Sequence, residues 1–341
     1  MIKKNNDCID VTKIILALMV VVIHSKSFGD NVYPFVRLAV PMFFIFSGYF
    51  SFSNIYFIED GNERDKKVIA IAKRFLKLYL FWFVLLLPYI LYVGHYFENG
   101  ILAGIGTMIH NFFLGSTFSG SWYIMANMLG ILIVYLLSKK LSNGKLMFIA
   151  VPLYLFATLF TEFRAEIAYM GKLAIVADTY EKIFLTPCFT FIIAIIYIVI
   201  GKIIAEKSLE GKLDYKYKTG TVICLGLLLL ECYIRRMSEL FVINCDCYVM
   251  LAPTAFFIVV WLMHVTIKVK NSKTLRNLST IIYCCHIPCV LVISGIFEVI
   301  GFNDPVNALT YIITVCITVC VGLVFLKLEK IPHLGFMKYS H

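Results

Sequence analysis

Charged residues are scarce in this chain of 341 residues. Only 15% are Asp, Glu, Lys or Arg, whereas 60% are hydrophobic and the mean hydropathy is +0.86. A water-soluble domain of this size needs more charge to cover its surface, so a soluble enzyme and a disordered chain are both excluded. The hydrophobic share is enough for about ten spans of about 20 residues. We therefore expect an all-α, polytopic bundle of membrane helices.

The sequence also lacks the marks of a secreted disulfide scaffold or of a metal site. It has 11 cysteines, but most lie inside apolar runs, where free cysteine behaves as a small hydrophobic residue. No two cysteine pairs stand at the spacing of a zinc site, so no metal is predicted. The first apolar run lacks a small-residue cleavage site and is expected to stay in the protein as a span.

Ten apolar segments occupy most of the chain, and each is read as a membrane-spanning helix. We expect a single integral-membrane domain over residues 1–341, without an appended soluble domain. The glycine-rich, uncharged stretch 100–120 is expected to lie at the outer interface or to re-enter the membrane. The expected spans are residues 9–28, 38–57, 75–94, 121–138, 145–160, 183–204, 219–234, 248–267, 279–300 and 307–326.

The placement of basic residues predicts the orientation, because Lys and Arg collect on the cytoplasmic side of membrane proteins. Ten spans leave both termini on one side. If that side is the cytoplasm, the inner segments hold 22 Lys and Arg residues and the outer segments hold seven. We therefore expect a multi-pass protein of the cell membrane with both termini in the cytoplasm. The net charge of +10 then indicates a lipid bilayer and not nucleic acid as partner.

Ionisable residues on the first span need an explanation, because each costs a few kcal/mol at membrane depth. Lys13 and His24 are eleven residues apart, which is close to three helical turns and about 16 Å, so they share one face. Lys13 then lies near the cytoplasm and His24 near the outer surface. On the residues alone, Lys13 extending to the inner interface and His24 capping the outer end is an equally good interpretation.

The run Asp10-x-x-Lys13, ten residues, His24 resembles the opening signature of the acyltransferase 3 family of integral-membrane acyltransferases. Four further elements follow in that family's order and are similar to its motifs. They are Arg37 to Tyr49 in the second span, Lys73 to Lys77 before the third, Ser121 to Ile124 at the start of the fourth, and Tyr283 to Pro288 in a late span. Lys stands at 13 and 77 where the family more often has Arg, which keeps the charge but loses bidentate geometry.

The resemblance implies an O-acyltransferase that moves an acyl group, expected to be acetyl, from cytosolic acyl-CoA to a hydroxyl. The acceptor would be an envelope glycan or a lipid-linked sugar. Acyl-CoA would be a co-substrate, with no bound cofactor. His24 matches the family's histidine and suits the role of general base, because the ordinary pKa of histidine is near neutral. Asp10 and Lys13 complete the catalytic signature that the resemblance implies.

The donor and acceptor ends have their own candidates. Lys73, Arg74 and Lys77 are expected to bind the phosphates of acyl-CoA at the inner mouth, although they also fit an ordinary cytoplasmic charge excess. The oxyanion and acceptor candidates are Ser121, Trp122, Tyr123 and Arg37. The first three fit an aromatic belt equally well, and Arg37 fits an interface anchor.

His286 is expected about seven residues into its span, in the inner half. It is therefore predicted to be a channel or structural group, with Tyr283 on the same helical face, and not the catalytic base. A second function stays open, because the chain also resembles the membrane domain of vancomycin-resistance serine racemases. That resemblance implies a transporter for a small polar solute such as serine.

Overall fold

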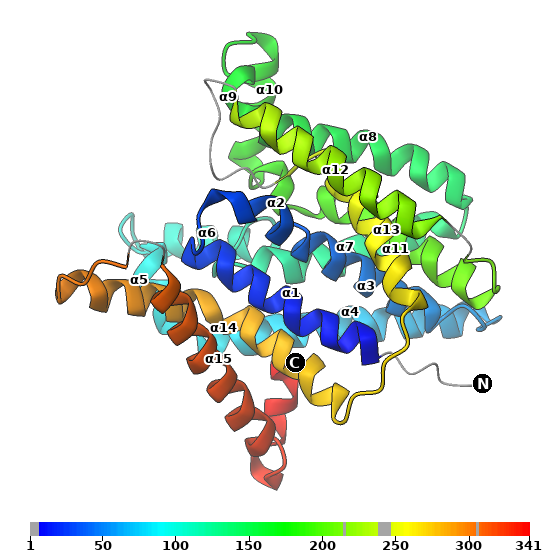
Figure 1. Ribbon diagram of the computed structural model, residues 1–341. Helices are drawn as coiled ribbons and strands as arrows, with labels where there is room; N and C mark the ends of the chain where they lie inside the picture. The colour runs from blue at the N-terminus through cyan, green and yellow to red at the C-terminus, as the bar shows by residue number, and fades with distance from the viewer. Residues whose placement is uncertain (1–6, 214–215, 238–246, 305–306) are drawn as a thin grey trace. The chain divides into compact units, whose positions relative to one another are not determined.

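The computed structural model describes residues 7–213, 216–237, 247–304 and 307–341 (Figure 1). Every regular element in these ranges is a helix, and none of them holds a strand. Eight helical segments are long and apolar enough to cross a membrane, and a bent pair makes nine. The predicted all-α membrane bundle is confirmed. Nine of the ten expected spans therefore have a counterpart of sufficient length. The tenth, 248–267, corresponds to the 14-residue helix α13 (Leu251–His264).

The chain forms two compact units. The first unit combines the N-terminal part up to Phe43 with Trp261–His341, and the second is Phe44–Val260. In the first unit, α1 (Asp7–Ser25) packs on α14 (Ser272–Val299), and α14 packs on α15 (Ala308–Leu328) (Figure 1). Ala17, Val21 and Ile282 form its buried centre. Two segments far apart in the sequence therefore share one apolar core.

Short elements complete the first unit. After α1 come the 3-10 helix η1 (Asp30–Val32) and α2 (Tyr33–Val36), and the chain closes with η3 (Pro332–Ser340) against α15. Asp304 caps the start of α15, since its carboxylate accepts hydrogen bonds from the backbone N–H groups of Ala308 at 3.1 Å and Thr310 at 2.9 Å. An acidic cap suits the positive end of the helix dipole.

The second unit is built around α11 (Phe191–Leu209), which packs against α7 (Ser121–Ser138) and α8 (Asn143–Glu162). Because α11 is apolar around most of its circumference, it suits a buried position. Part of α3 (Ala39–Ser53) contacts α11 closely at Gly48. A Cβ added to Gly48 would lie 2.7 Å from the carbonyl oxygen of Ile198, so only glycine fits this contact. Such small residues let membrane helices approach closely.

The expected third span, 75–94, corresponds to two helices joined at a bend. The structure has α4 (Gly61–Leu85), which packs on α7, and then α5 (Leu87–Gly94), bent from it by 72°. Pro88 stands in the first turn of α5, where its missing N–H and its ring prevent α4 from continuing. α4 also starts earlier than expected, at a turn where the Asp60 side chain accepts from the Asn62 N–H at 2.9 Å.

Two other expected boundaries need correction. The expected span 183–204 is shifted, because Pro187 lies in the 3-10 turn η2 (Pro187–Phe189) and Thr190 caps the true helix start. The expected span 279–300 begins earlier, at Ser272. Hydropathy detects the apolar part of a helix and misses its polar first turns. His286 therefore lies in the middle of α14 and not near its start.

The remaining helices belong to the second unit. The stretch 100–120 contains α6 (Ile101–Phe113), too short to span and with Ile101 and Leu102 largely exposed. A helix of that length suits both predicted positions, at the interface or re-entering the membrane. The others are α9 (Arg164–Ile167), α10 (Lys172–Ile183) and α12 (Tyr217–Arg236).

Candidate functional site

Two histidines from distant parts of the sequence meet in the first unit. The ring of His24, in the last turn of α1, lies 5.0 Å between centroids from the ring of His286 on α14, at an angle of 51°. His286 is 1% exposed, whereas the His24 side chain is accessible. The pair therefore consists of one ring that a substrate can reach and one that the helices bury.

The apolar core sets the register that brings these rings together. Val21 lies three residues before His24, and Ile282 lies four residues before His286, so each histidine continues the face of a core residue. Packing of Val21 against Ile282 then places the next turn of α1 beside the next turn of α14. The contact between the histidines follows from this apolar packing.

The hydrogen bonds of His286 determine which of its nitrogens carries a proton. Nδ1 lies 2.7 Å from the carbonyl oxygen of Tyr283 and 3.2 Å from that of Ile282. A carbonyl oxygen only accepts hydrogen bonds, so Nδ1 is the protonated nitrogen, and Nε2 of the neutral ring is an acceptor. Nε2 is buried and makes no hydrogen bond within the described residues.

A proline lies two residues after His286 in α14. Pro288 lies inside the helix, and it has no N–H to donate to the carbonyl of Cys284 one turn back. The imidazole of His286 bonds two other carbonyls of this turn, those of Tyr283 and Ile282. The spacing Tyr283-x-x-His286 therefore has a local structural meaning, because three residues along a helix bring the imidazole within reach of the Tyr283 carbonyl.

Arg37 is the third polar group at this end of the unit. Its charge acts on His24, and its guanidinium carbon lies 5.5 Å from the centre of the Tyr33 ring. Aromatic rings complete the surroundings, with Phe43 and Tyr283 in edge contact at 6.2 Å. Arg37 puts a positive charge near His24, so this end is suited to an anion or a developing negative charge.

The start of α1 holds a second polar group. Asp10 is 5% exposed, is hydrogen-bonded to Ser272 and interacts electrostatically with Arg276 and Lys13. Asp7 accepts a hydrogen bond of 2.9 Å from the N–H of Val269. Asp10 and Lys13 are thus brought together near the first turns of α14, at the end of α1 opposite His24. Sequence reasoning missed Arg276, although its place beside an apolar run was a usable signal.

The expected donor residues and three of the four oxyanion and acceptor candidates lie in the second unit, whereas Arg37 lies in the first. Lys73, Arg74 and Lys77 are exposed on α4, where a charged ligand can reach them. Ser121 is fully buried, and its Oγ accepts from the N–H groups of Thr117 at 3.0 Å and Phe118 at 3.3 Å. That hydroxyl is therefore engaged in holding the loop before α7.

The aromatic neighbours of Ser121 pack with other rings. Tyr123 lies 4.6 Å from Phe44 between centroids, and Trp122 lies 5.2 Å from Phe189. Both side chains are half-buried. These contacts join the start of α7 to α3 and to the turn before α11, and the predicted oxyanion role of the two residues stays a prediction.

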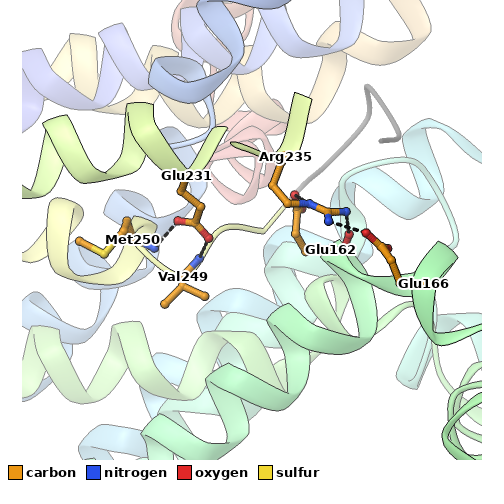
Figure 2. A network of polar contacts seen from close by, with 6 residues as sticks. All are labelled: Glu162, Glu166, Glu231, Arg235, Val249 and Met250. Atoms are coloured by element: carbon orange, nitrogen blue, oxygen red, sulfur yellow. Dashed lines mark hydrogen bonds and ion pairs between the residues drawn. The ribbon is translucent and has the colours of Figure 1, made fainter. Parts of the chain in front are cut away.

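A third group of charges, at one end of the second unit, has a structural explanation (Figure 2). Arg235 on α12 bonds Glu162 through Nε at 3.3 Å and Glu166 through Nη1 at 2.5 Å. Glu231, one turn earlier, accepts from the N–H groups of Val249 at 2.7 Å and Met250 at 2.9 Å. The network ties α12 to α8 and α9 and to the chain before α13.

Comparisons with known proteins agree with these motifs. A family model described as Acyltransferase domain matches residues 6–327. A serine/alanine racemase from Enterococcus gallinarum is 26% identical over 248 residues, which are 68% of this chain and 34% of that protein. An amino-acid racemase from Enterococcus faecalis is 23% identical over 344 residues, which are 94% of this chain and 46% of that protein.

The chain spans less than half the length of these relatives, so their names do not describe it as a whole. No solved structure matches it significantly. The family model covers nearly the whole chain, including the helices that carry His24 and His286. This multi-pass membrane protein therefore belongs to the acyltransferase 3 family of integral-membrane acyltransferases.

Proposed function

We propose that this protein is a membrane O-acyltransferase that transfers an acetyl group from cytosolic acetyl-CoA to a hydroxyl of an envelope glycan or lipid-linked sugar. The observation that carries the proposal is the accessible imidazole of His24 beside Arg37 and the buried His286, in a chain of an acyltransferase family. This end of the first unit offers a base and a cation, the two groups that acyl transfer to a hydroxyl needs.

In the proposed reaction His24 takes the proton of the acceptor hydroxyl as its oxygen attacks the thioester carbonyl. The carbonyl oxygen becomes negative in the tetrahedral intermediate, where the charge of Arg37 stabilises it. The intermediate collapses by breaking the carbon–sulfur bond, and the CoA thiolate leaves and takes up the proton from His24. The products are an ester and free CoA, so atoms and charge balance without a further reactant.

The charge distribution supports a two-sided arrangement of the substrates. The count of 22 basic residues against seven favours cytoplasmic termini, which puts His24 at the outer end of α1. Lys73, Arg74 and Lys77 are then on the inner side, where acyl-CoA arrives. Lys13, half-buried on α1, is proposed to guide the acyl-CoA arm between the two faces.

Purified protein in liposomes tests the proposal. With acetyl-CoA on one side and candidate glycans on the other, we expect ester formation that depends on His24. His24→Ala should lower kcat by about 10²–10⁴-fold, the usual contribution of a positioned base. His333→Ala, a change at an exposed residue of η3, is the matched control. Activity of His24→Ala within a few-fold of wild type would exclude His24 as the base.

A second candidate function is transport of a small polar solute such as serine, and the similarity to a protein named serine/alanine racemase supports it. A cation at Arg37 also suits the carboxylate of an amino acid. The same liposomes test this alternative through uptake of labelled serine. Suppose that the wild type takes up serine but transfers no acetyl group, and that the uptake is lost in Lys13→Gln. That result would favour the transporter over the acyltransferase.

A further inference from the structure

We propose that His286 is the positioning residue of His24, with its Nε2 atom accepting a hydrogen bond from the His24 ring. The inference rests on the proposed function, since it gives the base of that reaction its orienting partner. The sequence alone predicted only a channel or structural group at His286. The supporting observations are the ring contact at 5.0 Å and the Nε2 atom, which makes no hydrogen bond to any described residue.

The separation of the rings suits such a bond. A straight N–H···N bond of about 2.9 Å between two imidazoles sets their centroids about 5.2 Å apart. The observed separation is 5.0 Å with the rings tilted by 51°, so a small rotation of the accessible His24 ring brings a nitrogen onto Nε2. His286 does not need to move, because the Tyr283 and Ile282 carbonyls hold its Nδ1.

The protonation pattern gives the bond its direction. Nδ1 of His286 donates to the two carbonyls, so Nε2 is the acceptor and His24 must be the donor. The other nitrogen of His24 is then left without its proton and can accept the proton of a substrate hydroxyl. A fixed neighbour thereby selects the reactive tautomer of the base, the role that a carboxylate has in serine hydrolases.

A neutral partner also fits the surroundings. A buried carboxylate at this depth would carry a large desolvation cost. A neutral imidazole accepts the hydrogen bond without adding a charge, and Arg37 already supplies the charge that the oxyanion needs. Among the residues that the structure describes, Nε2 of His286 has no hydrogen-bond partner unless His24 supplies it, and an unsatisfied buried polar atom is costly.

Two substitutions separate positioning from packing. His286→Phe keeps a ring in the buried space but removes the acceptor, and His286→Gln keeps a polar atom near the place of Nε2. We expect kcat with acetyl-CoA to fall about 10- to 100-fold in His286→Phe, with the KM for acetyl-CoA unchanged and partial recovery in His286→Gln. His333→Phe is the control. Wild-type kcat in folded His286→Phe, or equal losses in both variants, would overturn the proposal.

A measurement without turnover keeps the inference separate from the proposed function. Nitrogen-15 NMR of labelled histidine in detergent micelles reports which ring nitrogen bears the proton. We expect a signal of a neutral ring protonated at Nδ1, absent from His286→Gln, and a shift of the His24 signals in His286→Phe. A His286 ring protonated at Nε2 would overturn the pairing even if the protein transfers acyl groups. If the expected spectrum is found but the protein transfers no acyl group, the pairing of His24 and His286 stands and the proposed function is wrong.

Discussion

The hydroxyl of Ser27 donates a hydrogen bond of 2.7 Å to the backbone carbonyl of Asn307. Ser27 follows the end of α1, and Asn307 directly precedes α15. The bond ties the segment after His24 to a neighbouring helix, while Ser25 is joined to Ser27 at 2.6 Å between their hydroxyl oxygens. The position of His24 thus depends on a polar contact at its own end of α1 as well as on the apolar core below it.

Removing this contact should affect turnover. In Ser27→Ala the end of α1 loses a hydrogen bond worth about 1 kcal/mol, and we expect kcat to fall roughly fivefold if the bond holds His24 in its reactive position. Two quantities are measured for each variant: the rate of acetyl transfer in liposomes and the unfolding temperature. Thr107→Ala, which removes an exposed hydroxyl bonded within its own helix, should leave both unchanged. An unchanged kcat in Ser27→Ala would show that the position of His24 does not depend on this hydrogen bond.

The donor assignment can be tested at the exposed basic residues of α4. Replacing Arg74 and Lys77 together by Gln should raise the apparent KM for acetyl-CoA by roughly tenfold, because each charge-assisted bond to phosphate is worth more than a neutral one. Acceptor affinity should change little. Lys145→Gln is a control on another helix of the same unit. A change in the acceptor KM alone would remove the CoA assignment.

Ser121 separates a structural role from an oxyanion role. Its buried hydroxyl accepts from two backbone N–H groups, so Ser121→Ala should destabilise the protein by about 1–3 kcal/mol through the unsatisfied donors. We expect a lower unfolding temperature and a kcat per folded molecule within twofold of wild type. A large loss of kcat in fully folded Ser121→Ala would instead support the predicted oxyanion role of this hydroxyl.

Arg235 should stabilise the second unit. Removing one partner of a buried ion pair costs about 3–5 kcal/mol, because the carboxylates are left without compensation. Arg235→Met should therefore lower the unfolding temperature by several degrees, whereas Lys172→Met, at an exposed lysine, should not. Equal effects of the two substitutions would contradict a special role for the network in Figure 2.

The same network predicts a dependence on acid. Burial raises the pKa of Glu166, but the hydrogen bond and charge of Arg235 outweigh it, and the pKa lies below its ordinary value. A carboxylate with a lowered pKa in the folded state stabilises the protein above its unfolded pKa of about 4.3. That stability is lost as the pH falls through the folded pKa. Melting temperatures below pH 5 should fall more steeply in wild type than in Glu166→Gln.

Much of the architecture was predictable from sequence because membrane insertion depends on composition. The scarcity of charge and the apolar runs predicted an all-helical membrane bundle, and nearly every expected span has a matching helix. The Asp10–Lys13–His24 spacing placed three candidate site residues on one helix, since a helix converts sequence separation directly into position. Boundaries failed where backbone chemistry outweighs hydropathy, at Pro88 and Pro187 and at the polar start of α14.

The partner of His24 was decided only by the tertiary structure. His286 is remote in sequence, and an early start of α14 together with packing between Val21 and Ile282 decides which turn of that helix reaches His24. Glu231, a carboxylate on an apolar helix, accepts from the backbone N–H groups of the chain before α13. Local spacing determines which residues share a helical face, but contacts between distant segments depend on side-chain packing, which no local pattern specifies.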